Sequence, residues 1–174
     1  HGDTAVDSHK ALPVLDFSLQ RLDSIELYPF KRLINNGLSS VMVAHLSVPA
    51  LESREGYPSS LSRNIITDLL KDRLHFKGLV FTDALNMEGV ADFTEAGDVE
   101  LSAFLAGNDI LLMPTDVVKA KAKILEAYNY GIISENRLAS SVKKILMAKY
   151  KVGLNQYHPV ELKNLYGDLN SMDN

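Results

Sequence analysis

Short apolar runs alternate with helical patterns along most of the chain. The runs occupy residues 38–46, 78–83 and 109–113, and they are rich in Val, Ile, Leu and Met. Apolar runs of this length with turn residues around them are typical of strands buried on both faces. Helical periodicity follows each run, most clearly at residues 62–75, 115–130 and 134–150. Strands that alternate with helices at such intervals predict βαβ units and a parallel sheet.

Capping residues and apolar stripes refine these helices. Ser60 or Ser62 is the expected cap of the first long helix, Thr115 of the second and Ser134 of the third. A shorter helix is predicted from about Pro29, and two short helical pieces are predicted at residues 88–93 and 99–105. In the last helix we expect these side chains to face inward: Leu138, Val142, Ile145, Leu146 and Tyr150.

Composition narrows the class of protein. The chain has 174 residues, 46% of them apolar, which suffices for one domain with a core. Its net charge of -4 and scattered basic residues argue against nucleic-acid binding, and without cysteine neither a disulfide nor a thiolate metal site can form. No run approaches the length of a membrane span and no signal peptide is visible. The first residue is His1 rather than Met, and a processed or truncated start could have removed a targeting segment. The compartment is therefore left open between the bacterial cytoplasm and the cell envelope or secretion.

Polar residues stand where two of the predicted strands end. The end of the first strand carries His45 and that of the second carries Asp83, whereas the third ends at Met113-Pro114. In parallel α/β proteins the ligand binds at the carboxyl ends of the strands. Asp83 could instead cap the next helix. The two polar exits favour a pocket, and the absence of G-x-G-x-x-G removes support for a dinucleotide site.

The first loop offers a second set of reactive side chains. Asp7 and His9 are two residues apart, and a carboxylate beside an imidazole suits acid/base catalysis near neutral pH. An exposed pair without function is the alternative. Because His1 and Asp3 lie close by, the loop could also hold a metal ion, although no strong metal motif is present. A Ser8 nucleophile is set aside because the G-x-S-x-G elbow is missing.

Several segments resemble the β-N-acetylglucosaminidases of glycoside hydrolase family 3. The two most specific are the loop His-Gly-Asp-Thr-x-x-Asp-Ser-His at residues 1–9 and Thr-Asp-Ala-Leu-x-Met at residues 82–87. Between and after them, in the family's order, come Val-Met-Val-Ala-His at 41–45, Pro-Ser-Ser-Leu-Ser at 58–62 and Ala-Gly-x-Asp-Ile-Leu-Leu at 106–112. The resemblance covers roughly residues 1–153.

The resemblance implies roles for individual residues. Asp83 matches the catalytic nucleophile, His9 the general acid/base and Asp7 the partner of His9. His45 and Met87 become candidate substrate-binding residues. The implied reaction removes a terminal β-linked N-acetylglucosamine, from cell-wall muropeptides or other glycans, with retention through a covalent glycosyl-enzyme. No metal or other cofactor is expected. An imidazole replaces one of the two carboxylates usual in retaining glycosidases.

The resemblance also implies a fold and a domain plan. The family's catalytic domain is a TIM-type (β/α)8 barrel, and the three predicted βα units match its C-terminal portion over residues 1–153. Residues 154–174 are expected to be a tail or linker to a further domain. The N-terminal half of the barrel, in the same or a separate chain, would then be a partner, and the chain alone would be inactive. A non-catalytic α/β carbohydrate-binding or scaffolding piece is the alternative function.

Overall fold

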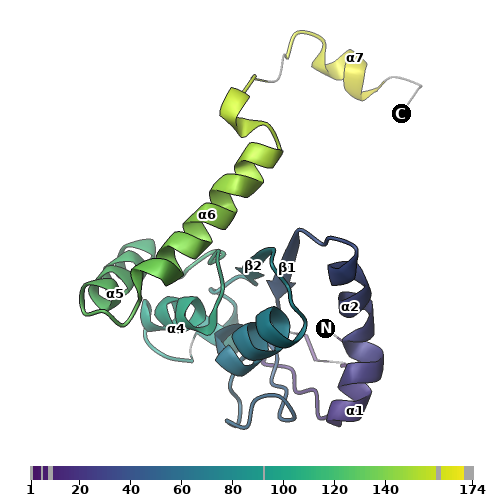
Figure 1. Cartoon of the computed structure of the whole chain (residues 1–174), viewed down its shortest axis with the longest axis vertical. Coiled ribbons are helices and arrows are strands. Elements are labelled where there is room, and N and C mark those ends of the chain that lie inside the picture. Colours follow the sequence, from purple (N-terminus) through teal and green to yellow (C-terminus); the bar gives the residue numbers. More distant parts are fainter. Residues whose placement is uncertain (1, 5, 8–9, 92, 160–161, 171–174) are drawn as a thin grey trace.

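The computed structural model describes residues 2–4, 6–7, 10–91, 93–159 and 162–170. It shows a mixed α/β body from which the C-terminal part of the chain extends (Figure 1). Among the described residues, no helix is both long and apolar enough to cross a membrane.

A parallel pair of strands lies at the centre of the body. β1 (Ser40–Val43) pairs with β2 (Leu79–Thr82) in the register Ser40↔Leu79 to Val43↔Thr82. Gly78 permits this approach, because a Cβ on it would lie 2.3 Å from the carbonyl oxygen of Ser39. The predicted parallel arrangement of the first two strands is confirmed.

Two further segments extend the sheet without forming regular strands. Ile110 makes a parallel bridge to Phe81, so the third predicted strand has the expected neighbour and direction. It stays irregular because the backbone N–H of Leu112 donates to the side chain of Thr82 (2.9 Å) instead of to a backbone carbonyl. On the other edge, Val14 bridges Ser47 in parallel, a pairing that the sequence pattern did not predict.

Helices follow the strands in the predicted order. They are α1 (Leu19–Arg21), the π-helix η1 (Leu22–Glu26), α2 (Tyr28–Asn35), the 3-10 turn η2 (Ser59–Leu61), the π-helix η3 (Asn64–Arg73), α3 (Glu88–Ala91), α4 (Asp98–Ala106), α5 (Val117–Asn129), α6 (Glu135–Lys151), the 3-10 turn η4 (Leu154–Gln156) and α7 (Leu165–Leu169). Ser134 caps α6 as predicted, accepting from Arg137 N. The predicted Thr115 cap of α5 is wrong. The Asp116 carboxylate takes that role by accepting from Val118 N and Lys119 N.

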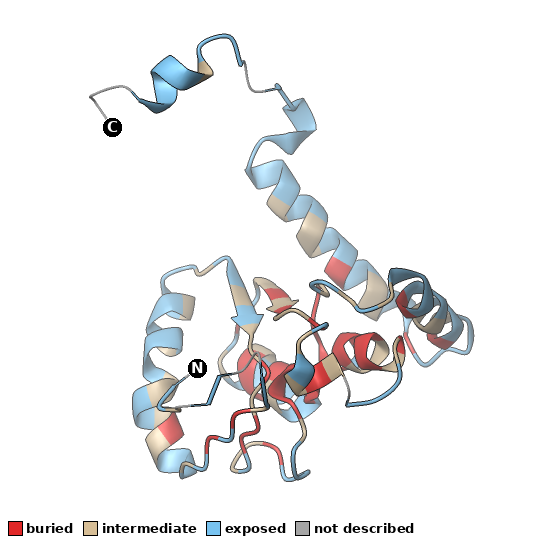
Figure 2. Cartoon of the chain, turned by 180° about the vertical axis from the view of Figure 1, so that it is seen from behind, coloured by how far each residue is buried: buried red, intermediate tan, exposed pale blue. Residues whose placement is uncertain are grey.

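The core lies where η3 and α4 pack against β2. Ile66 of η3, Phe76 and Val80 of β2 are at most 2% exposed and form one cluster. A second cluster joins Leu85 to α4 through Ala103, among others. Figure 2 shows buried positions concentrated in this part of the body.

The predicted inward stripe of α6 is only partly buried. Val142, Leu146 and Tyr150 are 45%, 59% and 68% exposed, so the prediction is wrong for these three. Leu138 and Ile145 are half-buried. The outer turns of α6 extend beyond the body, and no described element covers their apolar face (Figures 1 and 2).

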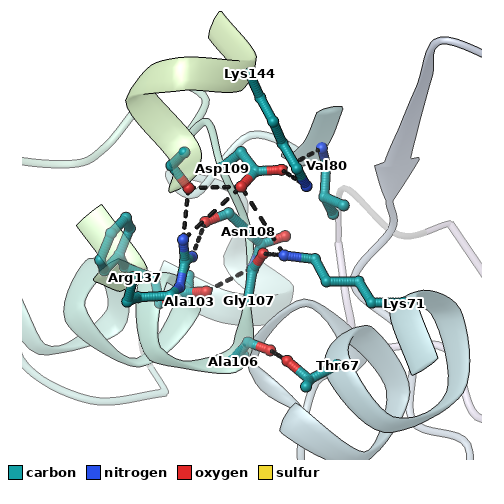
Figure 3. Close-up of polar contacts among 12 residues, drawn as sticks. Thr67, Lys71, Val80, Ala103, Ala106, Gly107, Asn108, Asp109, Arg137 and Lys144 are labelled. Atoms are coloured by element: carbon teal, nitrogen blue, oxygen red, sulfur yellow. Dashed lines mark hydrogen bonds and ion pairs between the residues drawn. The ribbon is translucent and has the colours of Figure 1, made fainter. Parts of the chain in front are cut away.

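A buried carboxylate attaches α6 to the sheet instead (Figure 3). Asp109, whose side chain is 1% exposed, accepts from Ser141 Oγ of α6 at 2.5 Å and from the backbone N–H of Val80 at 3.0 Å. Three cations surround the same carboxylate, at 3.1 Å (Lys144), 3.8 Å (Arg137) and 3.9 Å (Lys71). Ser141 is the residue of α6 that is buried, and its hydroxyl makes the hydrogen bond to Asp109.

Candidate active site

Asp83 is the first residue after β2, at the carboxyl end of the parallel pair. Its backbone N–H donates to Val43 O at 2.9 Å, which continues the pairing to β1. Its carboxylate is half-buried and accepts from the backbone N–H of Ala84 at 2.8 Å. The next helix, α3, begins five residues later at Glu88, so the helix-cap alternative is wrong. The side chain stands where ligands bind in parallel α/β proteins.

The backbone after Asp83 is held from the third strand segment. Leu85 N donates to Leu112 O at 2.9 Å, and Leu112 N donates to Thr82 Oγ1 at 2.9 Å. Thr82 and Leu85 are both fully buried. Thr82 and Leu85 on either side of Asp83 are therefore anchored to the third segment, while the backbone N–H of Asp83 itself is held by β1.

His45 holds the same backbone from the β1 side. The residue is fully buried, its Nε2 lies 3.0 Å from Ala84 O, and its Nδ1 lies 2.6 Å from Ser60 Oγ. A carbonyl only accepts, so Nε2 carries the proton and Nδ1 accepts from the Ser60 hydroxyl. Burial lowers the pKa of His45, against the opposing effects of the Ala84 carbonyl and the charge of Asp83. The imidazole is therefore held neutral beside Asp83.

His45 also has no surface with which to contact a sugar in this structure. Both of its ring nitrogens are engaged within the chain. Direct substrate binding by His45 stays a prediction. The geometry favours a role in holding the backbone next to Asp83.

Met87 lies on the turn that leads from Asp83 into α3. Its backbone N–H donates to Ala84 O at 3.1 Å, so this carbonyl accepts from both Met87 and His45. The Met87 side chain is half-buried. Its contact with substrate stays a prediction.

The N-terminal loop runs toward the same turn. Asp7 is exposed, and its carbonyl accepts from Lys10 N (3.0 Å) and Ala11 N (3.2 Å). A Cβ on Gly89 of α3 would lie 3.5 Å from Ala11 O, so the chain after Asp7 crosses the first turn of α3. His9 lies outside the described residues. The Asp7–His9 pair therefore stays a prediction.

Sequence reasoning missed the serines that brace the strand exits. Ser59 Oγ donates to Ala44 O (2.6 Å) and accepts from Leu46 N (3.1 Å), while Ser60 holds His45. Both serines are buried. The segment Pro-Ser-Ser-Leu-Ser at residues 58–62 contains these hydroxyls, but from the sequence it predicts only a helix cap. Only Ser62 has that contact, accepting from Ile65 N at 3.3 Å.

The loop after β1 contains a second buried carboxylate. Glu52 is 3% exposed and accepts from Arg54 Nε (2.8 Å), Arg54 Nη2 (2.7 Å) and Ser62 Oγ (2.6 Å). These hydrogen bonds, chiefly the ones from Arg54, lower its pKa to about 2. The Arg54 guanidinium stacks 3.5 Å above Tyr57, whose ring meets Phe93 edge-on at 5.1 Å. Phe93 belongs to the connection that follows Asp83, so this contact joins the two strand-exit loops.

Metal ligation has no support among the residues that the structure describes. They contain no group of three or more His, Asp or Glu side chains arranged to hold a metal ion. His1 and His9, which the metal hypothesis required, lie outside those residues.

Fold and site together are those of an α/β protein with a half-buried carboxylate at the carboxyl end of a parallel strand. Residues 1–148 match the family described as the glycosyl hydrolase family 3 N terminal domain. The chain belongs to glycosyl hydrolase family 3, which confirms the resemblance seen in the sequence.

Named relatives share this membership. Beta-hexosaminidase A of Pseudoalteromonas piscicida is 32% identical over 171 residues, covering 87% of this chain and 29% of that protein. Beta-hexosaminidase of Chromobacterium violaceum is 35% identical over 127 residues, covering 71% of this chain and 34% of that protein.

A solved structure agrees with them. The glycoside hydrolase family 3 beta-N-acetylglucosaminidase from Paenibacillus sp. str. FPU-7 is 37% identical with a TM-score of 0.86, and the match covers 94% of this chain and 31% of that chain. The chain thus spans about a third of the length of the relatives it matches.

Proposed function

We propose that this chain carries the nucleophile and acid/base residues of a retaining exo-β-N-acetylglucosaminidase, with Asp83 as nucleophile. The observation that carries the proposal is the position of Asp83. Its carboxylate follows β2 directly, and the backbone around it is anchored to both neighbouring segments. Relatives named as beta-hexosaminidases at 32–35% identity indicate the substrate class.

Asp83 attacks the anomeric carbon of a terminal N-acetylglucosamine and forms a glycosyl-enzyme. His9 protonates the leaving oxygen and then takes a proton from the attacking water, so that both half-reactions balance. Asp7 stabilises the imidazolium form of His9. The roles of His9 and Asp7 rest on the family motif at residues 1–9.

In this proposal residues 1–153 form the C-terminal portion of a TIM-type barrel, and residues 154–174 lead out of it. The supporting observation is the order of the four parallel segments in space, which follows the chain from Val14 through β1 and β2 to Ile110. Among the described residues, the two outermost segments, at Val14 and at Ile110, each pair with a neighbour on one side only. The apolar stripe of α6 is also exposed. Preceding strands of the barrel would supply both, together with the rest of the sugar-binding groups. The 174-residue chain alone is then inactive.

Hydrolysis of aryl N-acetylglucosaminides tests the function. The longest natural form of the protein is compared with the 174-residue chain, and with Asp83→Asn and His9→Ala variants of the longest form. We expect activity only in the longest form. Asp83→Asn should abolish it, and His9→Ala should lose far more activity on a poor leaving group than on an activated one.

Two outcomes would contradict the proposal. Wild-type turnover by Asp83→Asn excludes the nucleophile. Equal losses by His9→Ala with both leaving groups exclude the acid role. Absence of glycosidase activity in every form, with retained glycan binding, would favour the non-catalytic carbohydrate-binding alternative.

A further inference from the structure

The polar contacts behind Asp83 converge on one carbonyl group. Ala84 O accepts from His45 Nε2 at 3.0 Å and from Met87 N at 3.1 Å. The N–H of the same peptide unit, on Leu85, donates to Leu112 O at 2.9 Å. The preceding peptide N–H, on Ala84, donates to the Asp83 carboxylate at 2.8 Å. The position of the Ala84 backbone therefore sets the position of the carboxylate.

His45 is the only side chain among the described residues that the structure shows bonded to Ala84 O. Ser60 holds the far side of the ring, and Ser60 is itself fixed because Asn108 Nδ2 donates to Ser60 O at 2.8 Å. His45, Ser60 and Asn108 are all fully buried. The ring thus lies in a rigid setting that allows one orientation and one tautomer.

We propose that His45 is a positioning residue for the reaction: in its neutral Nε2–H tautomer it donates to Ala84 O and thereby aims the Asp83 carboxylate at the anomeric carbon. The inference rests on the proposed function of Asp83. It replaces sugar contact by His45 with control of the nucleophile. A displacement of a reacting group by about 1 Å can cost about 100-fold in rate, so loss of this contact should slow the first chemical step.

Two variants of similar size separate the two contacts of the ring. In His45→Gln the amide nitrogen takes the place of Nε2 and keeps donation to Ala84 O. In His45→Asn the amide lies at the level of Nδ1 and keeps only the contact with Ser60. Ser60→Ala removes the other side of the arrangement and leaves Nε2 free to donate. Ile66→Val shortens a fully buried core side chain of η3, and it serves as the control for a loss of stability alone.

The experiment measures kcat, KM and the rate of glycosyl-enzyme formation by rapid-quench mass spectrometry in the longest natural form. His45→Asn should lose about 30- to 100-fold in kcat and in glycosyl-enzyme formation, with KM within about threefold. His45→Gln should stay within about fivefold of wild type, whereas Ser60→Ala, which frees one side of the ring, should lose less activity than His45→Asn. Equal losses in Gln and Asn variants, or a rise in KM without loss of kcat, would overturn the inference.

A second measurement does not depend on the variants being folded or active. In protein labelled with ¹⁵N-histidine, the His45 resonances should report the Nε2–H tautomer at neutral pH. An Nδ1–H tautomer or an imidazolium would overturn the inference even if the enzyme is active. Conversely, an active Asp83→Asn variant would defeat the proposed function itself, and so the two failures are distinguishable.

Discussion

Two carboxylates at opposite ends of neighbouring strand segments behave differently. Asp83 follows β2 and is half-buried, and among the described residues its carboxylate accepts one hydrogen bond, from the next backbone N–H. Asp109 precedes the third segment, is buried, and is surrounded by Ser141, a backbone N–H and three cations (Figure 3). β2 is four residues long, so its two ends lie about 10 Å apart.

The two carboxylates differ in how many hydrogen-bond and ion-pair partners they have. At the amino end of β2 the carboxylate is saturated with partners and has no capacity left for a ligand. At the carboxyl end the backbone is fixed while the side chain keeps acceptor capacity. A carboxylate that serves stability is thus distinguished from one that can serve chemistry by its partners rather than by its sequence context.

Asp83→Asn should have the largest effect on catalysis and little effect on stability. Loss of the proposed nucleophile should reduce kcat by at least about 1000-fold, or roughly 4 kcal/mol of barrier. The melting temperature should change by no more than about 2 °C, because the side chain has few partners to lose. Steady-state kinetics and thermal unfolding on the same preparation test this. A large loss of stability would place Asp83 in the same class as Asp109.

Asp109→Asn should lower the free energy of unfolding. The change leaves three cations around a neutral amide, and removing one partner of a buried ionic group costs about 3–5 kcal/mol. Asp68→Asn is the matched control, because Asp68 is 54% exposed and pairs with Arg63 at 3.7 Å. The control should cost less than about 1 kcal/mol. Equal effects in denaturant unfolding would show that the Asp109 cluster contributes no more than a surface pair.

Glu52 is a third carboxylate for comparison, because it is buried and hydrogen-bonded like Asp109 but lies in the loop after β1, at the end of the sheet that carries Asp83. Its folded-state pKa of about 2 lies below the usual 4.5. The stability it contributes is therefore present above pH 4.5 and is lost as the pH falls from 4.5 toward 2. The difference in unfolding free energy between wild type and Glu52→Gln should reach up to about 3 kcal/mol at pH 7 and shrink below pH 4.5. A difference independent of pH would exclude the Arg54 pairing as its cause.

Lys71→Met should have the smallest effect. Burial, together with the charges of Lys144 and Arg137, lowers the pKa of Lys71 to about 8, against the attraction of Asp109. Two cations remain for Asp109, so the free energy of unfolding should change by less than about 1 kcal/mol. Wild-type stability should also gain from pH 8 toward 10.5, where the unfolded chain binds a proton that the native chain has lost, and the variant should lack this gain. A loss as large as that of Asp109→Asn would contradict this balance.

Much of the fold follows from local patterns. The apolar runs identified β1 and β2, but the expectation that both faces of each strand are buried is wrong for β1, where Met42 is 56% exposed. Ser134 identified the start of α6, because its hydroxyl needs only a backbone N–H three residues away. Thr115 failed as a cap because α5 begins at Val117, so that Asp116 and not Thr115 directly precedes the helix and accepts from its first N–H groups.

Other features depend on contacts between distant parts of the chain. The pairing of Val14 with Ser47 is too short to leave a periodic signal. The periodicity of α6 predicts an inward apolar stripe, yet Val142 and Tyr150 are 45% and 68% exposed. Periodicity reports that a face is suited to burial but not which part of a protein buries it.

The sequence by itself determined the parallel α/β order, the strand exit at Asp83 and, through its motifs, membership of glycosyl hydrolase family 3. Tertiary structure decided the place of the other polar residues. His45 stands at a strand exit just as Asp83 does, but packing against Ser60 and Ala84 buries it completely. The reason is that a residue type and its position in a strand set what a side chain can do, whereas burial and hydrogen-bond partners come from segments that are 15 and 39 residues away in the sequence.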